Sequence, residues 1–151
     1  MVSQLQLFKL PKINRKETQK NVEQALELYR YYLLTVPEER LPKVTASYSL
    51  VTPSNTNEFN SSTENAVIQK VDFEIARDNH LGRIRKAVNR LTKQERQAVI
   101  MKYFGDDELF DYEVYNELGM SETYYHQKFK PRIFYKLAFI LRIEVFESVD
   151  K

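Results

Sequence analysis

The sequence predicts an all-α fold that ends in a helix-turn-helix, and two observations carry this prediction. Apolar residues recur at spacings of three and four along several stretches of the chain, which is the spacing that lines one face of a helix. Near the C-terminus a single glycine, Gly119, separates two runs that both have helical character. Because the 151 residues include only three glycines, a glycine at this place indicates a specific turn.

The N-terminal region, residues 1–36, is expected to contain one amphipathic helix over about residues 15–34. Asn14 with Glu17 three residues later is typical of a capping box at a helix start, and Pro37 lies just after its end. The predicted buried face of this helix consists of Val22, Ala25, Leu26, Tyr29 and Leu33.

Residues 37–62 are rich in Pro, Ser, Thr and Asn and show no helical period. Such composition is typical of an extended arm or a linker, so no regular structure is predicted there.

Residues 63–91 predict one long amphipathic helix, with Ser61 and Glu64 as its capping box and a bend at Gly82. The apolar stripe changes phase near Asn79 and is too short and irregular for a sustained coiled coil. It is therefore interpreted as a face of the protein's own core, with a dimer seam as the alternative. The stripe consists of Val67, Val71, Ile75, Ile84, Val88 and Leu91.

The last region, residues 92–151, holds the predicted helix-turn-helix. A helix capped by Thr92 and Glu95 should end at Gly105, and its apolar residues should face inward. A short helix over residues 111–118 follows, with Val114 and Leu118 facing in. The expected inward residues of the first helix are Ala98, Val99, Ile100 and Tyr103.

The turn after the short helix explains the position of Gly119. Gly119 follows the last apolar residue, where glycine takes a left-handed cap without strain. Met120 is expected to plug the turn, and Ser121 is a strong N-cap for the next helix. A short helix, this turn and a longer helix with basic side chains together predict a helix-turn-helix whose second helix enters the DNA major groove.

Helical spacing from Ser121 divides the reader helix into an outer and an inner face. Tyr125 and Phe129 should belong to the core. Tyr124 should either form a hydrogen bond with a DNA phosphate or be a partly buried ring. Gln can pair with adenine, Glu can accept from cytosine and Thr can contact a thymine methyl group. The base-edge candidates are Glu122, Thr123, His126 and Gln127.

Basic residues of the same helix are better suited to DNA phosphates, where they set the register of the protein on the duplex without reading sequence. These candidates are Lys128, Lys130 and Arg132.

This region resembles the helix-turn-helix of sigma-factor region four, in which a leucine and a Glu-Arg pair open the domain and a Leu-Gly-apolar-Ser turn precedes the reader helix. The matching residues here are Leu91, Glu95, Arg96, Leu118, Gly119, Met120 and Ser121. Two positions depart from that pattern. Tyr115 stands where most helix-turn-helix units carry a small residue, and Pro131 should kink the reader helix or end and restart it.

A resemblance over nearly the whole chain is carried by "LPKVTASYSL", "SSTENAVIQKVD", "AVNRLTKQER", "FDYEVYNELGMS" and "FYKLAFIL". These stretches resemble the ArpU family of phage-encoded transcriptional regulators. The resemblance implies control of late or lysis-related genes in a phage or prophage, and it makes Tyr115 a family feature.

Other chemistry has little support in the sequence. His80 and His126 have no second ligand at metal spacing, so no metal and no cofactor are expected. The acidic group Asp106, Asp107, Glu108 and Asp111 could hold a divalent cation as in a nuclease, or simply stop one helix and place negative charge at the start of the next. No glycine-rich phosphate loop is present, so the chain is not expected to be an enzyme.

The expected location is the cytoplasm of a bacterial host. The sequence has no cysteine, no apolar window of membrane-spanning length and no signal-peptide pattern at its start. The net charge of +2 does not identify a nucleic-acid partner by itself. However, lysine and arginine residues cluster within residues 83–102 and again after Gly119.

The sequence thus predicts a sequence-specific transcriptional regulator. Double-stranded DNA is the expected partner, RNA polymerase and a second copy of the chain are further candidates, and no membrane is expected. The alternative is a phage assembly protein such as a small terminase subunit, which would bind DNA as a large ring.

Overall fold

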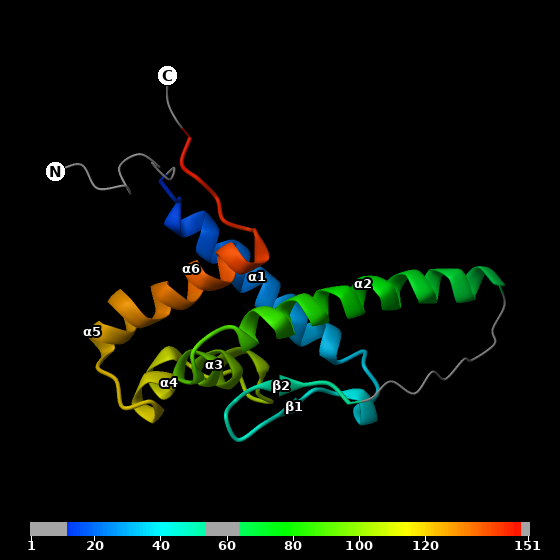
Figure 1. Ribbon diagram of the computed structural model, residues 1–151, viewed down its shortest axis with the longest axis horizontal. Coiled ribbons are helices and arrows are strands. Elements are labelled where there is room, and N and C mark those ends of the chain that lie inside the picture. The colour runs from blue at the N-terminus through cyan, green and yellow to red at the C-terminus, as the bar shows by residue number, and fades with distance from the viewer. Residues whose placement is uncertain (1–11, 54–63, 149–151) are drawn as a thin grey trace.

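The computed structural model describes residues 12–53 and 64–148, so residues 1–11 and the expected cap at Ser61 lie outside it (Figure 1). The predicted all-α class is confirmed. Among the described residues no helix is long and apolar enough to cross a membrane. The α-helices are α1 (Arg15–Leu33), α2 (Glu64–Asn89), α3 (Lys93–Val99), α4 (Asp111–Glu117), α5 (Glu122–Tyr124) and α6 (Lys130–Leu141). Shorter helical segments are the 3-10 turn η2 (Glu38–Arg40) and the π-helical segments η3 (Ile100–Phe104) and η4 (Tyr125–Phe129).

Of the predicted capping boxes, the one at Thr92 is complete, and the one at Asn14 is present as a single side-chain bond. The Asn14 side chain accepts a hydrogen bond of 3.1 Å from the Glu17 N–H at the start of α1. Thr92 and Glu95 form a reciprocal capping box before α3, because each side chain accepts from the backbone N–H of the other. These bonds satisfy N–H groups that have no partner inside a helix.

One hydrophobic core unites helices that are far apart in sequence. α1 crosses both α2 and α6 (Figure 1), and its Val22, Leu26 and Tyr29 are almost fully buried. The chain segments before α1 and after α6 also pair, since the Asn14 N–H donates to the Val145 carbonyl at 2.8 Å. The N-terminal region therefore packs directly on the predicted DNA-binding region.

The segment predicted as an irregular arm is partly ordered, which corrects that prediction. Two short antiparallel strands, β1 (Lys43–Val44) and β2 (Leu50–Val51), form a hairpin. Leu50 is buried, and the Asn89 side chain both accepts from its N–H and donates to its carbonyl. Composition could not predict this, because the contacts that order the hairpin come from the end of α2.

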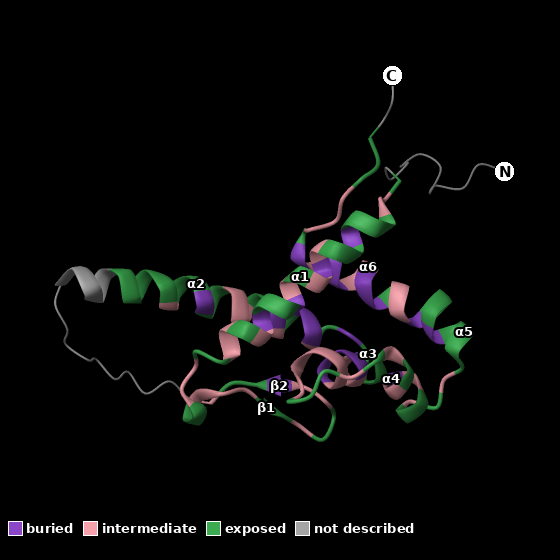
Figure 2. Ribbon diagram, turned by 180° about the vertical axis from the view of Figure 1, so that it is seen from behind, coloured by how far each residue is buried: buried purple, intermediate pink, exposed green. Residues whose placement is uncertain are grey.

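The long helix α2 is continuous through Gly82, but only its C-terminal half belongs to the core. Ile84 and Val88 are buried, as predicted, whereas Val71 and Ile75 are exposed, which corrects the predicted continuous buried stripe. Figure 1 shows the reason: the N-terminal half of α2 extends beyond the other helices, and Figure 2 shows its described part as mostly exposed. The end of α1 reaches this half at Phe73, whose ring centroid lies 5.9 Å from that of Tyr32, on the side away from Val71 and Ile75.

Candidate nucleic-acid interface

The turn between α4 and α5 has the geometry that the sequence predicts. Gly119 has a φ angle of 70°, which confirms the left-handed cap. Its N–H donates to the Asn116 carbonyl at 3.2 Å, and the Met120 N–H donates to the Tyr115 carbonyl at 2.9 Å. This pair of bonds is a Schellman motif, which satisfies the last carbonyls of α4 and turns the chain sharply.

Ser121 starts the next helical run as predicted. Its Oγ accepts a hydrogen bond of 3.1 Å from the Tyr124 N–H, and its backbone is extended. The run continues through α5, η4 and α6 and does not end at Pro131. Because proline lacks an N–H and its ring would collide with the carbonyl four residues earlier, the wider π-helical turn of η4 provides the room that Pro131 needs.

The inner face of this run is held by aromatic packing. Tyr125 and Phe129 are buried as predicted. Tyr115, the unusual residue of α4, packs its ring 5.5 Å from that of Tyr125 and 6.1 Å from that of His126, measured between ring centroids. A large residue at this position therefore fills the contact between α4 and the following helices.

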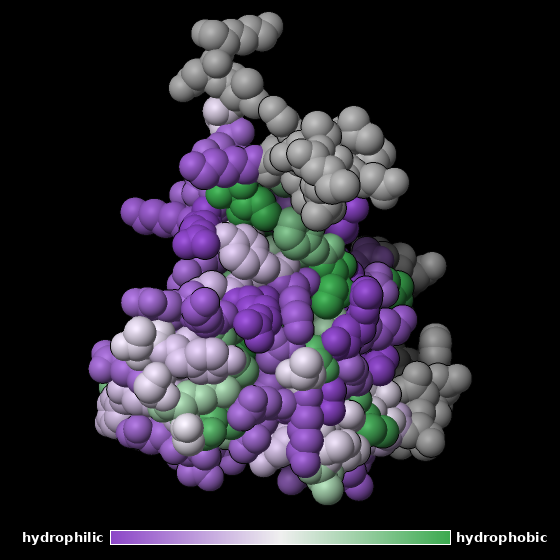
Figure 3. Space-filling view, turned by 60° about the vertical axis from the view of Figure 1, so that its left-hand side comes forward, coloured by the Kyte–Doolittle hydropathy of each residue, from purple (hydrophilic) through white to green (hydrophobic). Residues whose placement is uncertain are grey.

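The outer face carries most of the predicted DNA-contacting residues. Tyr124 is 41% exposed, and its ring centroid lies 6.4 Å from that of Phe129, so the ring is partly covered. Figure 3 shows a largely hydrophilic surface on the side of the molecule that includes α5. The exposed candidates are Ser121, Glu122, Thr123, Tyr124, His126, Gln127, Lys128 and Arg132.

Lys130 differs from the other candidates because its side chain is largely covered and already paired. Its Nζ donates to Asp111 Oδ2 at 2.9 Å, and its side chain is only 18% exposed. The opposite oxygen of Asp111 accepts from Lys102 and from the Tyr125 hydroxyl. Lys130 thus joins α6 to α4, and its predicted phosphate contact would require it to leave this cluster.

The Asp111 cluster has a distinct electrostatic character. Burial alone would raise the pKa of the Asp111 carboxyl, but hydrogen bonds from Lys102, Lys130 and Tyr125 hold that pKa well below its usual range. Burial and the adjacent carboxylate both raise the pKa of Tyr125, which stays a donor. The cluster is charged and satisfied, and it connects η3, α4, η4 and α6.

Two residues of the sigma-like motif also have structural roles. Burial opposes ionisation of Glu95, yet hydrogen bonds from Lys136 and from Thr92 lower its pKa. Arg96 donates to the carbonyls of Leu91, Ser47 and Tyr48, so it ties the start of α3 to the hairpin.

The alternative prediction, a site for a divalent cation, falls within the described residues. No group of three His, Asp or Glu side chains there is arranged to hold a metal ion. His80 Nε2 lies 2.9 Å from the Ala25 carbonyl, and Asp111 is occupied by two lysines. Sequence reasoning missed Asp111 as the centre of a cluster, because the alternation of acidic and basic segments does not reveal which members meet.

Comparison with known proteins places the chain among phage proteins. It is 34% identical over 139 residues to an uncharacterized phage-related protein of Listeria innocua, Lin1259/Lin1739, covering 92% of this chain and 96% of that protein. It is also 29% identical over 143 residues to Protein Gp66 of Listeria phage A118, covering 93% and 97% of the two chains. No protein-family model matches the chain, and no solved structure matches it.

Proposed function

We propose that this chain, which belongs to the same family as the phage-related protein of Listeria innocua, is a DNA-binding transcriptional regulator of phage or prophage genes. Its targets would be late or lysis-related genes, as the resemblance to the ArpU regulators implies. The sigma-like character of the C-terminal region makes RNA polymerase a second proposed partner.

The observation that carries this proposal is the turn at Gly119 together with the face that follows it. The Schellman motif and the Ser121 cap fix the angle between α4 and the next helical run. The outer side chains of that run are polar and exposed, whereas its inner side chains are aromatic and buried. Reading the major groove requires a helix whose inner face is packed against the protein and whose outer face carries hydrogen-bonding groups.

Within this proposal the side chains divide by role. Glu122, Thr123 and Gln127 would contact base edges, and His126 would do so with its ring steadied by Tyr115. Lys128 and Arg132, which are exposed, would contact phosphates.

Sequencing of genomic fragments retained by the purified protein would test the proposal. We expect enrichment of one phage or prophage promoter region and a shared motif within it. Gln127→Ala should weaken specific binding by about 1–3 kcal/mol and relax the preference at one base position. Gln24→Ala, which changes an exposed glutamine of α1, is the matched control and should bind normally. Retention of all fragments alike would contradict sequence-specific regulation.

One observation favours self-association. Val71 and Ile75, which lie one turn apart on the same side of the projecting half of α2, are 40% and 54% exposed. A dimer of this kind fits a regulator, whereas a large ring would instead support the small terminase subunit.

A further inference from the structure

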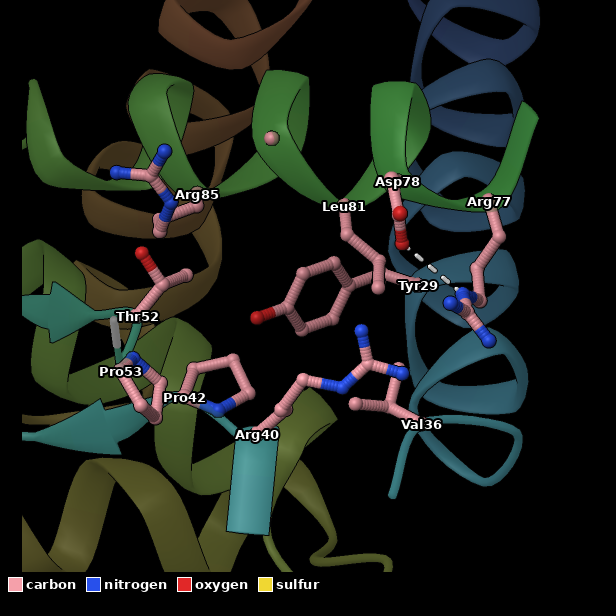
Figure 4. Close-up of a pocket in the computed structure, with 11 residues that line it drawn as sticks. Tyr29, Val36, Arg40, Pro42, Thr52, Pro53, Arg77, Asp78, Leu81 and Arg85 are labelled. Atoms are coloured by element: carbon pink, nitrogen blue, oxygen red, sulfur yellow. Dashed lines mark hydrogen bonds and ion pairs between the residues drawn. The ribbon is translucent and has the colours of Figure 1, made fainter. Parts of the chain in front are cut away.

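A second candidate site lies away from the reader helix, between α1, the middle of α2 and the two ends of the hairpin region (Figure 4). The pocket has a volume of about 200 Å³. Pockets that enclose a drug-sized ligand measure roughly 300–1,000 Å³, so a smaller occupant is indicated. Its apolar wall consists of Val36, Pro42, Pro53 and Leu81.

The polar side chains of the pocket carry excess positive charge. Arg77 is paired with Asp78 at 3.0 Å and also donates to the Thr35 carbonyl, so its charge is compensated. Arg40 and Arg85 also line the pocket, and no carboxylate of the described residues lies within 4.0 Å of either one. Two uncompensated guanidinium groups therefore line the pocket, at opposite ends of it: Figure 4 shows that of Arg40 toward Val36 and Arg77 and that of Arg85 on the side of Thr52.

The pocket also contains two buried polar atoms that lack a partner within the described part of the chain, Tyr29 Oη and Arg85 Nε. Such atoms are rare in proteins, because a buried donor without an acceptor destabilises the fold. Figure 4 shows the Tyr29 hydroxyl pointing toward the side of the pocket where Thr52 and Arg85 lie. Burial raises the pKa of Tyr29 to about 12, against the lowering effect of Arg85, so the hydroxyl remains a donor at neutral pH.

We propose that the end of this pocket near Thr52 binds a small phosphate, either inorganic phosphate or the terminal phosphate of a small ester, held by Arg85 and Tyr29. The Arg85 guanidinium is well suited to phosphate oxygens, and Arg40 adds a second positive charge to the same pocket. The phosphodiester of DNA carries one charge and a sugar on both sides, so it fits a confined pocket poorly. The site is independent of the proposed reading of DNA by the helix after Ser121.

Calorimetric titration of the full chain with inorganic phosphate, at an ionic strength held constant with chloride, tests the proposal. We expect one phosphate per chain, and binding about ten- to a hundredfold weaker in Arg85→Met, because a charged hydrogen bond is lost. Lys86→Met, an exposed neighbour on α2, is the matched control and should bind like the wild type. A parallel titration with glycerol phosphate distinguishes a phosphate ester from the free ion as the preferred ligand.

Tyr29→Phe separates binding from folding. This substitution keeps the aromatic ring, whose centroid lies 4.3 Å from that of Phe104, and removes only the unpartnered hydroxyl. Without phosphate its melting temperature should equal or exceed that of the wild type, while phosphate should bind about tenfold more weakly.

Two results would overturn the proposal. One is phosphate binding that is absent, or equal in the wild type, Arg85→Met and Tyr29→Phe. The other is a loss of duplex DNA affinity in Arg85→Met without any binding of free phosphate, which would assign the pocket to a DNA phosphate instead.

Discussion

At the scale of single residues, Gly119 shows how a backbone angle determines the candidate interface. A Cβ atom added there would meet nothing within 4 Å, so steric space does not require glycine. The requirement comes from the φ angle of 70°, which side chains with a Cβ adopt only at a cost.

We therefore expect Gly119→Val to destabilise the protein by about 1–3 kcal/mol and to reduce DNA binding. Gly119→Asn should recover much of this loss, because asparagine tolerates the left-handed region. Gly82→Ala is the control: Gly82 lies inside α2 with open space around it, so alanine should stabilise by about 0.5–1 kcal/mol. Thermal unfolding followed by circular dichroism measures all three, and equal melting of the valine variant would remove the strained-cap explanation.

Two lysines in the helical run after Ser121 have the same side chain but different surroundings. Lys128 is exposed, whereas Lys130 is paired with Asp111. Lys128→Ala should lower affinity for specific and random DNA alike and make the salt dependence shallower by about one unit. Lys20→Ala on the exposed side of α1 should change neither. A loss limited to one sequence would instead indicate that Lys128 reads a base.

At the scale of the elements, the Asp111 cluster holds α4 to η3 and to the helical run after Ser121. One carboxylate accepts from side chains of η3, η4 and α6 while belonging to α4 itself. Removing such a partner leaves two largely covered ammonium groups unpaired, which is more costly than losing a surface ion pair.

Asp111→Asn should consequently destabilise the protein by about 2–3 kcal/mol at pH 7. Because the folded pKa of Asp111 is lowered, its contribution is complete above the unfolded value of about 3.9 and is lost as pH falls toward the folded value. Urea unfolding between pH 7 and pH 3 should show a weaker acid dependence in the variant. Asp106→Asn, an exposed neighbour, should keep the wild-type dependence; equal slopes in all three proteins would contradict the role of Asp111.

At the scale of the whole molecule, one half of α2 is buried in the core and the other half extends beyond it. Its C-terminal half is central to the core, while its N-terminal half exposes apolar residues that a second copy could cover. A monomer leaves Val71 and Ile75, one turn apart on the same side of α2, in water, and burying them against a second copy would be favourable.

Light scattering of the purified protein should give twice the 18.0 kDa mass of one chain. Ile75→Glu should return the mass to that of the monomer, because it places a charge in the proposed contact. Val44→Glu adds the same charge at an exposed apolar residue of β1 and should leave the dimer intact. A monomeric wild type would exclude the α2 contact, and a ring of many copies would favour the assembly protein.

The sequence by itself determined the helices, their caps and the turn, because these depend on neighbours a few residues away. Asn14, Thr92, Gly119 and Ser121 each perform the predicted local role. Tyr125 and Phe129 were predictable as core for the same reason, since helical periodicity fixes which side a residue faces.

Only the tertiary structure decided which of these faces have partners. The hairpin is ordered by Asn89 and Arg96, which lie about forty to fifty residues away in sequence, and the pairing of Lys130 depends on where α4 packs. The exposure of Val71 and Ile75 follows from α2 being longer than the core that it crosses. A spacing of three and four gives a helix an apolar side, but whether that side is covered depends on elements whose positions are set by long-range packing.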